Sequence, residues 1–169
     1  YWSSDVCSSD LSFPQRIQEF SAFPNAEILD PIYTAPPGAI VTGSVAALAV
    51  QSCDSILAGT NEGVIRSADG GEIWASVNTG LAAAQVIALA GDLDGRLFAG
   101  SAGGGIYRSV DKGVTWTQQG LRNMHVQGLA ILSDGTVFAG AQAGVFRSTD
   151  NGETWETFNN GLTTTFVRS

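Results

Sequence analysis

The chain has 169 residues, a length typical of one domain, and 44% of them are hydrophobic, which is enough for a packed core and excludes wholesale disorder. Sixteen acidic against eight basic residues give a net charge of -8, which argues against binding to nucleic-acid phosphates. No apolar run approaches the roughly 18–20 residues that span a bilayer, so we expect no membrane span.

The first 44 residues share no pattern with the rest of the chain. Residues 1–11 resemble a translated sequencing adapter, and we expect them to be non-native. All five prolines lie within residues 12–44, which predicts a linker or irregular segment, because each proline removes a hydrogen-bond donor from a strand. The two cysteines, Cys7 and Cys53, are too few for a disulfide framework or a closed zinc site. The chain starts at Tyr1 rather than Met, which indicates a fragment of a longer protein.

A motif of the form Ser-x-Asp-x-Gly-x-x-Trp occurs three times in the remaining sequence. The copies begin at Ser67, Ser109 and Ser148, so they are 42 and 39 residues apart. Each copy is preceded by Arg and followed by a Gly-Leu pair, and each has matching apolar segments upstream. Three copies at nearly fixed spacing predict a repeat architecture with one structural unit per copy.

Each unit has the pattern of four short strands. In the middle copy we predict strands at Val86–Ala90, Arg96–Ala99, Gly105–Ser109 and Thr115–Gln118, because Asp-Gly and Gly-Gly turns separate these β-rich runs. Helical periodicity is absent from residues 45–169. A repeated unit of about 40 residues with four strands is typical of a β-propeller blade.

We therefore predict an all-β fold, a partial β-propeller of three four-stranded antiparallel blades in an incomplete ring. The blades are expected at residues 45–81, 82–121 and 122–162, and residues 163–169 are expected to form the first strand of an unfinished fourth blade. Propellers typically have four to eight blades, so three cannot close a ring. The open ends predict association with the remaining blades of the parent chain or with another copy.

The residues that the three copies share are predicted to be structural. The Ser and Asp side chains can bind backbone N–H groups of the turn, the Gly is expected at positive φ, and the Trp is expected to fill the wedge between neighbouring blades. These residues are Ser67, Asp69, Gly71, Trp74, Ser109, Asp111, Gly113, Trp116, Ser148, Asp150, Gly152 and Trp155.

The motif resembles the Asp box, or bacterial neuraminidase repeat, and the resemblance covers residues 45–162. Asp boxes are known from sialidase-type propellers, sortilin-type receptors, some xyloglucan-degrading glycosidases and photosystem II assembly-factor-like proteins. The resemblance implies that the box is a structural staple remote from the ligand site. It also implies that Asp69, Asp111 and Asp150 hold turns rather than act as catalytic acids.

The ligand site of a propeller usually lies on the face formed by the inter-blade loops and the loops between the second and third strands. The ionisable residues in these loops are Glu62, Arg122 and His125, and together with Asn123 they are the candidate ligand-binding residues. Glycoside hydrolysis usually needs two carboxylates, and the sialidase resemblance would imply three arginines with a Tyr–Glu pair. The alternative is that Glu62 is an ordinary surface turn residue and His125 a packed or solvated side chain. We predict no catalytic residue, no metal site and no cofactor in this chain.

The sequence thus favours a non-catalytic binding or assembly module of a larger secreted or periplasmic protein, with a protein or carbohydrate partner. A purely structural role in a multi-domain surface protein cannot be separated from this interpretation. The alternative is a fragment of a sialidase-like or xyloglucanase-like glycoside hydrolase whose catalytic residues lie in blades outside this chain.

Overall fold

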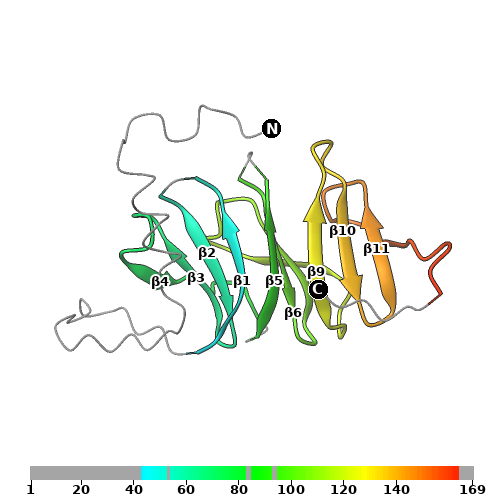
Figure 1. Cartoon of the computed structure of the whole chain (residues 1–169), viewed down its shortest axis with the longest axis horizontal. Helices are drawn as coiled ribbons and strands as arrows, with labels where there is room; N and C mark the ends of the chain where they lie inside the picture. Colours follow the sequence, from blue (N-terminus) through cyan, green and yellow to red (C-terminus); the bar gives the residue numbers. More distant parts are fainter. Residues whose placement is uncertain (1–42, 53, 83–84, 93–94, 164–169) are drawn as a thin grey trace. The chain divides into compact units, whose positions relative to one another are not determined.

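The computed structural model describes residues 43–52, 54–82, 85–92 and 95–163. These residues contain no helix and form three four-stranded antiparallel sheets that close no ring (Figure 1), so the predicted fold class is confirmed. The expectations for residues 1–42, for Cys7 and Cys53, and for a further strand over 164–169 lie outside the described residues.

Within each sheet the strands pair in chain order. The first sheet contains β1 (Val45–Val50), β2 (Ile56–Thr60), β3 (Gly63–Ser67) and β4 (Trp74–Ser76). The second sheet contains β5 (Val86–Gly91), β6 (Leu97–Ser101), β7 (Gly105–Ser109) and β8 (Thr117–Gly120). The third sheet contains β9 (Val126–Ile131), β10 (Val137–Ala141), β11 (Gly144–Ser148) and β12 (Glu156–Thr157).

Two of the predicted strands in the second sheet begin too early. The strand predicted at Arg96 starts at Leu97, because the Arg96 N–H donates to Asp92 Oδ1 at 3.0 Å and so belongs to the turn. The strand predicted at Thr115 starts at Thr117, because the Thr115 N–H donates to Asp111 Oδ1 at 2.8 Å. In both cases a side-chain carboxylate takes the backbone donor that a strand would use.

The sheets stack through their first and second strands. β1 contacts β5, and β5 contacts β9 in turn, so the first strands of the three sheets follow one another (Figure 1). A Cβ on Gly59 of β2 would lie 2.8 Å from Val86 Cγ1, and a Cβ on Gly100 of β6 would lie 2.9 Å from Val126 Cγ1. Glycine in the second strand therefore lets the valine of the next sheet approach the backbone closely.

The hydrophobic core lies between the sheets. One buried cluster joins Leu57 and Val64 of the first sheet to Leu97 and Trp116 of the second repeat. The other cluster joins residues of the second and third sheets, namely Phe98, Ile106, Val126, Val137, Ala139, Ala141 and Phe146. Since each cluster draws on two sheets, burial of apolar surface stabilises the stacking as well as each single sheet.

Candidate functional site

The three turns between the third and fourth strands share a set of hydrogen bonds made by a serine, an aspartate and a glycine. We call them the Ser-Asp-Gly-Trp motifs, with the first at 67–74, the second at 109–116 and the third at 148–155. In the second motif Ser109 Oγ donates to Asp111 Oδ1 at 2.7 Å and accepts the Gly113 N–H at 2.8 Å. The corresponding serine–aspartate distances are 2.6 Å in the first motif and 2.7 Å in the third. The motif glycines have φ values of 101°, 85° and 87°, as the sequence predicts.

The motif aspartates also accept hydrogen bonds from the residue four positions later, and this sets their pKa values. Although desolvation by burial raises the pKa of Asp111, the side-chain and backbone donors of Thr115 outweigh it and lower the pKa to about 2. The hydroxyl and the N–H of Thr154 lower the pKa of Asp150 to about 2. In the first motif Ile73 offers only its N–H, which with Ser67 lowers the pKa of Asp69. Charged carboxylates that accept several hydrogen bonds are suited to holding a turn, and not to donating a proton near neutral pH.

The motif tryptophans differ in what they contact. Trp116 is 3% exposed, and its Nε1 donates to the carbonyl oxygen of Val77 in the preceding repeat at 2.9 Å. Trp155 is half-buried, and its Nε1 donates both to the Gln119 carbonyl oxygen of the preceding repeat at 2.9 Å and to the Gly152 carbonyl oxygen of its own turn at 3.1 Å. Trp74 is only half-buried, and its Nε1 donates within its own turn to the Gly71 carbonyl oxygen at 3.0 Å.

Two of the three motif glycines pack against the second strand of the preceding sheet. A Cβ on Gly113 would lie 2.5 Å from Leu57 Cδ2, and a Cβ on Gly152 would lie 2.6 Å from Phe98 Cε1. A Cβ on Gly71 would meet nothing closer than 3.9 Å. The second and third motifs therefore join neighbouring sheets, whereas the first motif only closes its own turn.

Of the four candidate ligand-binding residues, Glu62 lies apart from the others in sequence, on the β2–β3 turn of the first sheet. It is exposed, its N–H donates to Thr60 Oγ1 at 3.1 Å, and its carbonyl oxygen accepts from Asn78 Nδ2 at 3.0 Å. The backbone of Glu62 thus takes part in the turn, and its carboxylate is the only one in the described loops at this end of the sheets.

Arg122, Asn123 and His125 come together because they share the connection between β8 and β9. Arg122 and Asn123 are exposed, and Asn123 has a φ of 62°. His125 is half-buried and forms a β-bridge with Ala102 of the β6–β7 turn. The structure therefore places one cation, one amide and one imidazole on a short loop beside that turn.

The hydrogen bonds of this loop show that the Gly-Leu pairs of the first and second repeats are not equivalent. The Leu81 N–H donates to the Asn78 carbonyl oxygen at 2.9 Å, and the equivalent bond in the second repeat runs from Met124 to Leu121 at 3.1 Å. Leu121 thus takes the place of Asn78, and Asn123 takes the positive φ that Gly80 has. The pair Gly120-Leu121 is not the counterpart of Gly80-Leu81, since Gly80 follows Trp74 by six residues and Gly120 follows Trp116 by only four. A β-bulge in β8 adds one residue, so that Asn123, seven residues after Trp116, takes the position of Gly80.

The amide of Asn78 has a structural role that sequence reasoning missed. Asn78 Oδ1 accepts the Val64 N–H at 2.7 Å, and in the third repeat Asn159 Oδ1 accepts the Val145 N–H at 2.8 Å. In the second repeat Gln118 Nε2 donates to the Gly104 carbonyl oxygen at 2.8 Å instead. The signal was available, since an asparagine follows both Trp74 and Trp155 by four residues.

Across the described part of the chain, no three His, Cys, Asp or Glu side chains are grouped as a metal site would require. Asp92 forms an ion pair with Arg96 at 2.5 Å. The described residues also contain no helix that is long and apolar enough to cross a membrane.

Residues 42–167 match the family of the DUF6242 β-propeller domain. The chain belongs to this family. The match covers the three sheets and the connections between them, so this β-propeller domain accounts for all the strands described here. A search of curated proteins gave no match to the sequence.

Solved structures with similar folds include proteins of different kinds. An ancestral GH74 enzyme is 23% identical with a TM-score of 0.57, over 72% of this chain and 19% of that enzyme. The structure of YCF48 bound to D1 peptide is 16% identical with a TM-score of 0.60, over 73% of this chain and 45% of that one. The extracellular domain of a hybrid two-component system protein from B. thetaiotaomicron is 18% identical with a TM-score of 0.59, over 76% and 18%. The chain thus spans less than half the length of these three structures, and the likeness is one of fold.

Proposed function

We propose that this chain is a non-catalytic binding or assembly module within a larger β-propeller. The observation that carries the proposal is the chemistry of the loop end, where the described loops hold Glu62 as the only carboxylate. Hydrolysis of a glycoside usually needs two carboxyl groups on either side of one bond. The loop of Arg122, Asn123 and His125 offers hydrogen bonds and one positive charge, which suits recognition of a protein or carbohydrate.

The Ser-Asp-Gly-Trp motifs act as Asp boxes in this proposal. Their shared hydrogen bonds, the positive φ of Gly113 and Gly152, and the Trp116 and Trp155 bonds to the preceding repeat support a structural role. They lie at the end of the sheets opposite the loops of Glu62 and Arg122, because each antiparallel strand reverses direction. A change in a motif should therefore alter stability and leave binding at the loop end intact.

Further blades, or another copy of the chain, would complete the ring. Val86 and Val126 are 0% exposed because each packs on the preceding sheet, whereas Val45, at the equivalent position of β1, is 51% exposed. Leu48 and Val50 of the same strand are also exposed. A preceding blade of the same kind would cover these side chains, as the first sheet covers Val86. The parent protein is expected to be secreted or periplasmic, in keeping with the extracellular domain among the structural neighbours.

The test is a binding and turnover screen with the whole chain. We expect retention of a protein or glycan ligand from a glycan array or a periplasmic protein fraction, with no release of sugar from sialyllactose or xyloglucan. Arg122→Ala should weaken retention, whereas Asp111→Ala should leave it unchanged at a temperature where both variants are folded. Turnover of either substrate, or equal loss of retention in both variants, would contradict the proposal.

A glycoside hydrolase remains the second candidate, because Glu62 is an exposed carboxylate at the loop end. In that case the second carboxylate, or a cluster of arginines, would come from the loops of other blades of the parent protein. The uninterrupted parent gene distinguishes the candidates. A carboxylate pair or arginine cluster in equivalent loops would favour the enzyme, and its absence would remove this candidate.

A further inference from the structure

A hollow of about 280 Å³ lies between the first and second sheets, at the end that carries the motifs. Gln51 and Ser55 of the β1–β2 turn form one side, and Arg66 of β3 lies beside them. Asp92, which follows β5, and Lys112 of the second motif form the other side. No sequence pattern pointed to this place.

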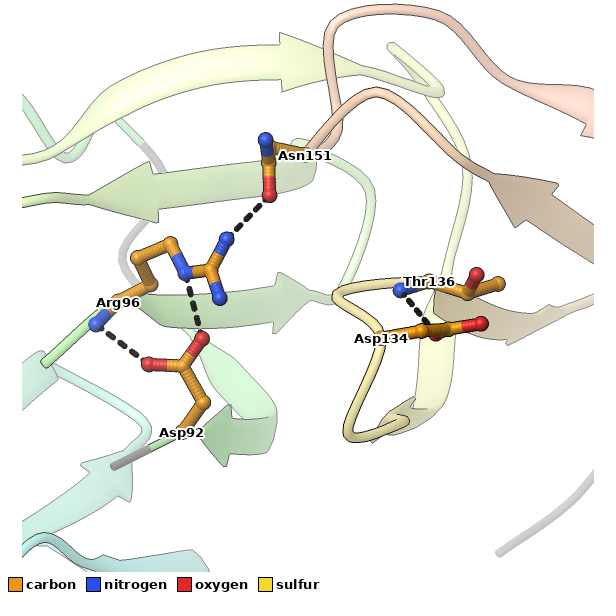
Figure 2. Close-up of polar contacts among 5 residues, drawn as sticks. All are labelled: Asp92, Arg96, Asp134, Thr136 and Asn151. Carbon is orange, nitrogen blue, oxygen red and sulfur yellow. Dashed lines mark hydrogen bonds and ion pairs between the residues drawn. The ribbon is translucent and has the colours of Figure 1, made fainter. Parts of the chain in front are cut away.

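The corresponding place between the second and third sheets is filled by one side chain. Figure 2 shows that Arg96 lies there, with its Nε donating to Asp92 Oδ2 and its Nη1 donating to Asn151 Oδ1. A Cβ on Gly135 would lie 3.5 Å from Arg96 Nη1, so the guanidinium also lies close to the next sheet.

Backbone hydrogen bonds show which residues of the first and second repeats are equivalent. The Gln51 N–H donates to the Ser55 carbonyl oxygen at 3.0 Å, and the Asp92 N–H donates to the Arg96 carbonyl oxygen at 3.0 Å. Ser55 thus occupies the position of Arg96, and its short side chain leaves the space open. By motif position Lys112 corresponds to Asn151, and both have a positive φ, of 59° and 60°.

Some polar atoms of the residues that line the hollow lack partners among the described residues. Both amide atoms of Gln51, the hydroxyl of Ser55 and the Nε of Arg66 are buried without a hydrogen bond. The Nε of Arg108, in the equivalent position of the second sheet, is also without one, so Gln51 and Ser55 are what distinguish the hollow. Leaving such groups unpaired is costly, and a ligand that pairs with them would recover that free energy.

The charges around the hollow favour a negative ligand. Asp92 is paired with Arg96 at 2.5 Å, which leaves Arg66 and Lys112 against the single carboxylate of Asp54 on the lining. Arg66, Lys112, the Gln51 amide and the Ser55 hydroxyl can all donate hydrogen bonds. In a chain with a net charge of -8, a hollow lined by two cations and several neutral donors is a local exception.

We propose that this hollow binds a small oxyanion, the carboxylate, sulfate or phosphate group of a soluble ligand. Arg66 and Lys112 supply the charge, and Gln51 and Ser55 supply neutral hydrogen bonds. Its volume is below that of typical pockets for drug-sized molecules, which are roughly 300–1,000 Å³, and this fits one charged group or a small molecule. The hollow lies at the opposite end of the sheets from Arg122 and His125, so this proposal does not rest on the proposed function.

The experiment is an NMR titration of the ¹⁵N-labelled chain with sodium phosphate, sodium sulfate and sodium acetate, at ionic strength held constant with sodium chloride. We expect saturable shifts of the Gln51 and Ser55 amides with at least one anion, and the tightest binder identifies the group. If none of the three anions gives saturable shifts at these amides, the proposal is overturned.

Two variants and one control locate the site. Lys112→Asn should weaken binding about tenfold, because it removes one charged donor, and asparagine suits the positive φ as it does at Asn151. Gln51→Asp, Ser55→Arg and Lys112→Asn combined copy the filled arrangement, in which Arg96 is held by Asp92 and Asn151, and should abolish binding. Arg122→Ala removes one positive charge at the other end and should leave affinity within about twofold. Equal weakening by Arg122→Ala and Lys112→Asn would show unspecific attraction and contradict the proposal.

Discussion

The first and second Ser-Asp-Gly-Trp motifs have nearly the same local geometry but different surroundings. In both, the serine hydroxyl accepts the glycine N–H at 2.8 Å. Yet Trp116 is buried and bonded to the preceding repeat, whereas Trp74 is half-buried and bonded within its own turn. Local hydrogen bonds therefore form the turn, and the preceding sheet buries the indole.

The largest effect is expected from the tryptophans. Trp116→Ala removes a buried indole that joins two sheets, and should lower the free energy of unfolding by about 3–5 kcal/mol. Trp74→Ala should cost clearly less, because that side chain is already partly exposed. Urea unfolding followed by circular dichroism measures both changes. Equal losses of stability in the two variants would contradict the claim that the two indoles differ in their surroundings.

The motif glycines also distinguish the first motif from the second. Gly113→Ala places a Cβ 2.5 Å from Leu57 Cδ2, while Gly71→Ala meets no atom closer than 3.9 Å. Both positions have positive φ, so the backbone strain is shared and the clash is not. We expect Gly113→Ala to be less stable than Gly71→Ala by about 1–3 kcal/mol of unfolding free energy. Thermal unfolding midpoints that coincide would refute the clash.

A smaller effect on stability is expected when the pH is lowered. The pKa values of Asp111 and Asp150 are lowered to about 2, so their contribution to stability is present above the unfolded pKa of about 3.9 and is lost as pH falls toward 2. Thr154→Val removes the hydroxyl donor and should raise the pKa of Asp150 toward its unfolded value, so that less stability is lost on acidification and the loss is complete at a higher pH. Unfolding midpoints between about pH 4.5 and 2 test this, with Thr163→Val as a control outside the motif.

The smallest effect comes from giving the first motif the missing donor. Ile73→Thr copies Thr115 and Thr154, and should lower the pKa of Asp69 further with a slight gain in stability above pH 4. NMR titration of the Asp69 carboxyl carbon measures it directly. An unchanged pKa would mean that the hydroxyl does not reach the carboxylate at this position.

The fold could be predicted from the sequence because each repeat contains the residues that form its turn. Ser109, Asp111 and Gly113 predict the turn by local hydrogen bonds, and these do not depend on the rest of the chain. The strand starts at Leu97 and Thr117 were missed because Asp92 and Asp111 divert the backbone donors of Arg96 and Thr115 into turns.

The candidate sites were predicted less completely. Arg122, Asn123 and His125 could be placed on one loop because they are close in sequence. The bulge at Gln119 was missed, although Gly120 follows Trp116 by four residues whereas Gly80 follows Trp74 by six. The hollow depends on Ser55, Arg66 and Lys112, which lie far apart in sequence and meet only when two sheets stack. The sequence marks the hollow only by a difference between repeats, since Ser55 stands where the second repeat has Arg96. A search for residues that the repeats share does not detect such a difference.

The most direct measurement is ¹⁹F NMR of the chain labelled with 5-fluorotryptophan, with each resonance assigned by a single Trp→Phe variant. The difference in chemical shift between H₂O and D₂O reports solvent access for each indole. If stacking of sheets buries the motif tryptophans, Trp116 should show a clearly smaller solvent shift than Trp74. Equal solvent shifts for Trp116 and Trp74 would contradict this account.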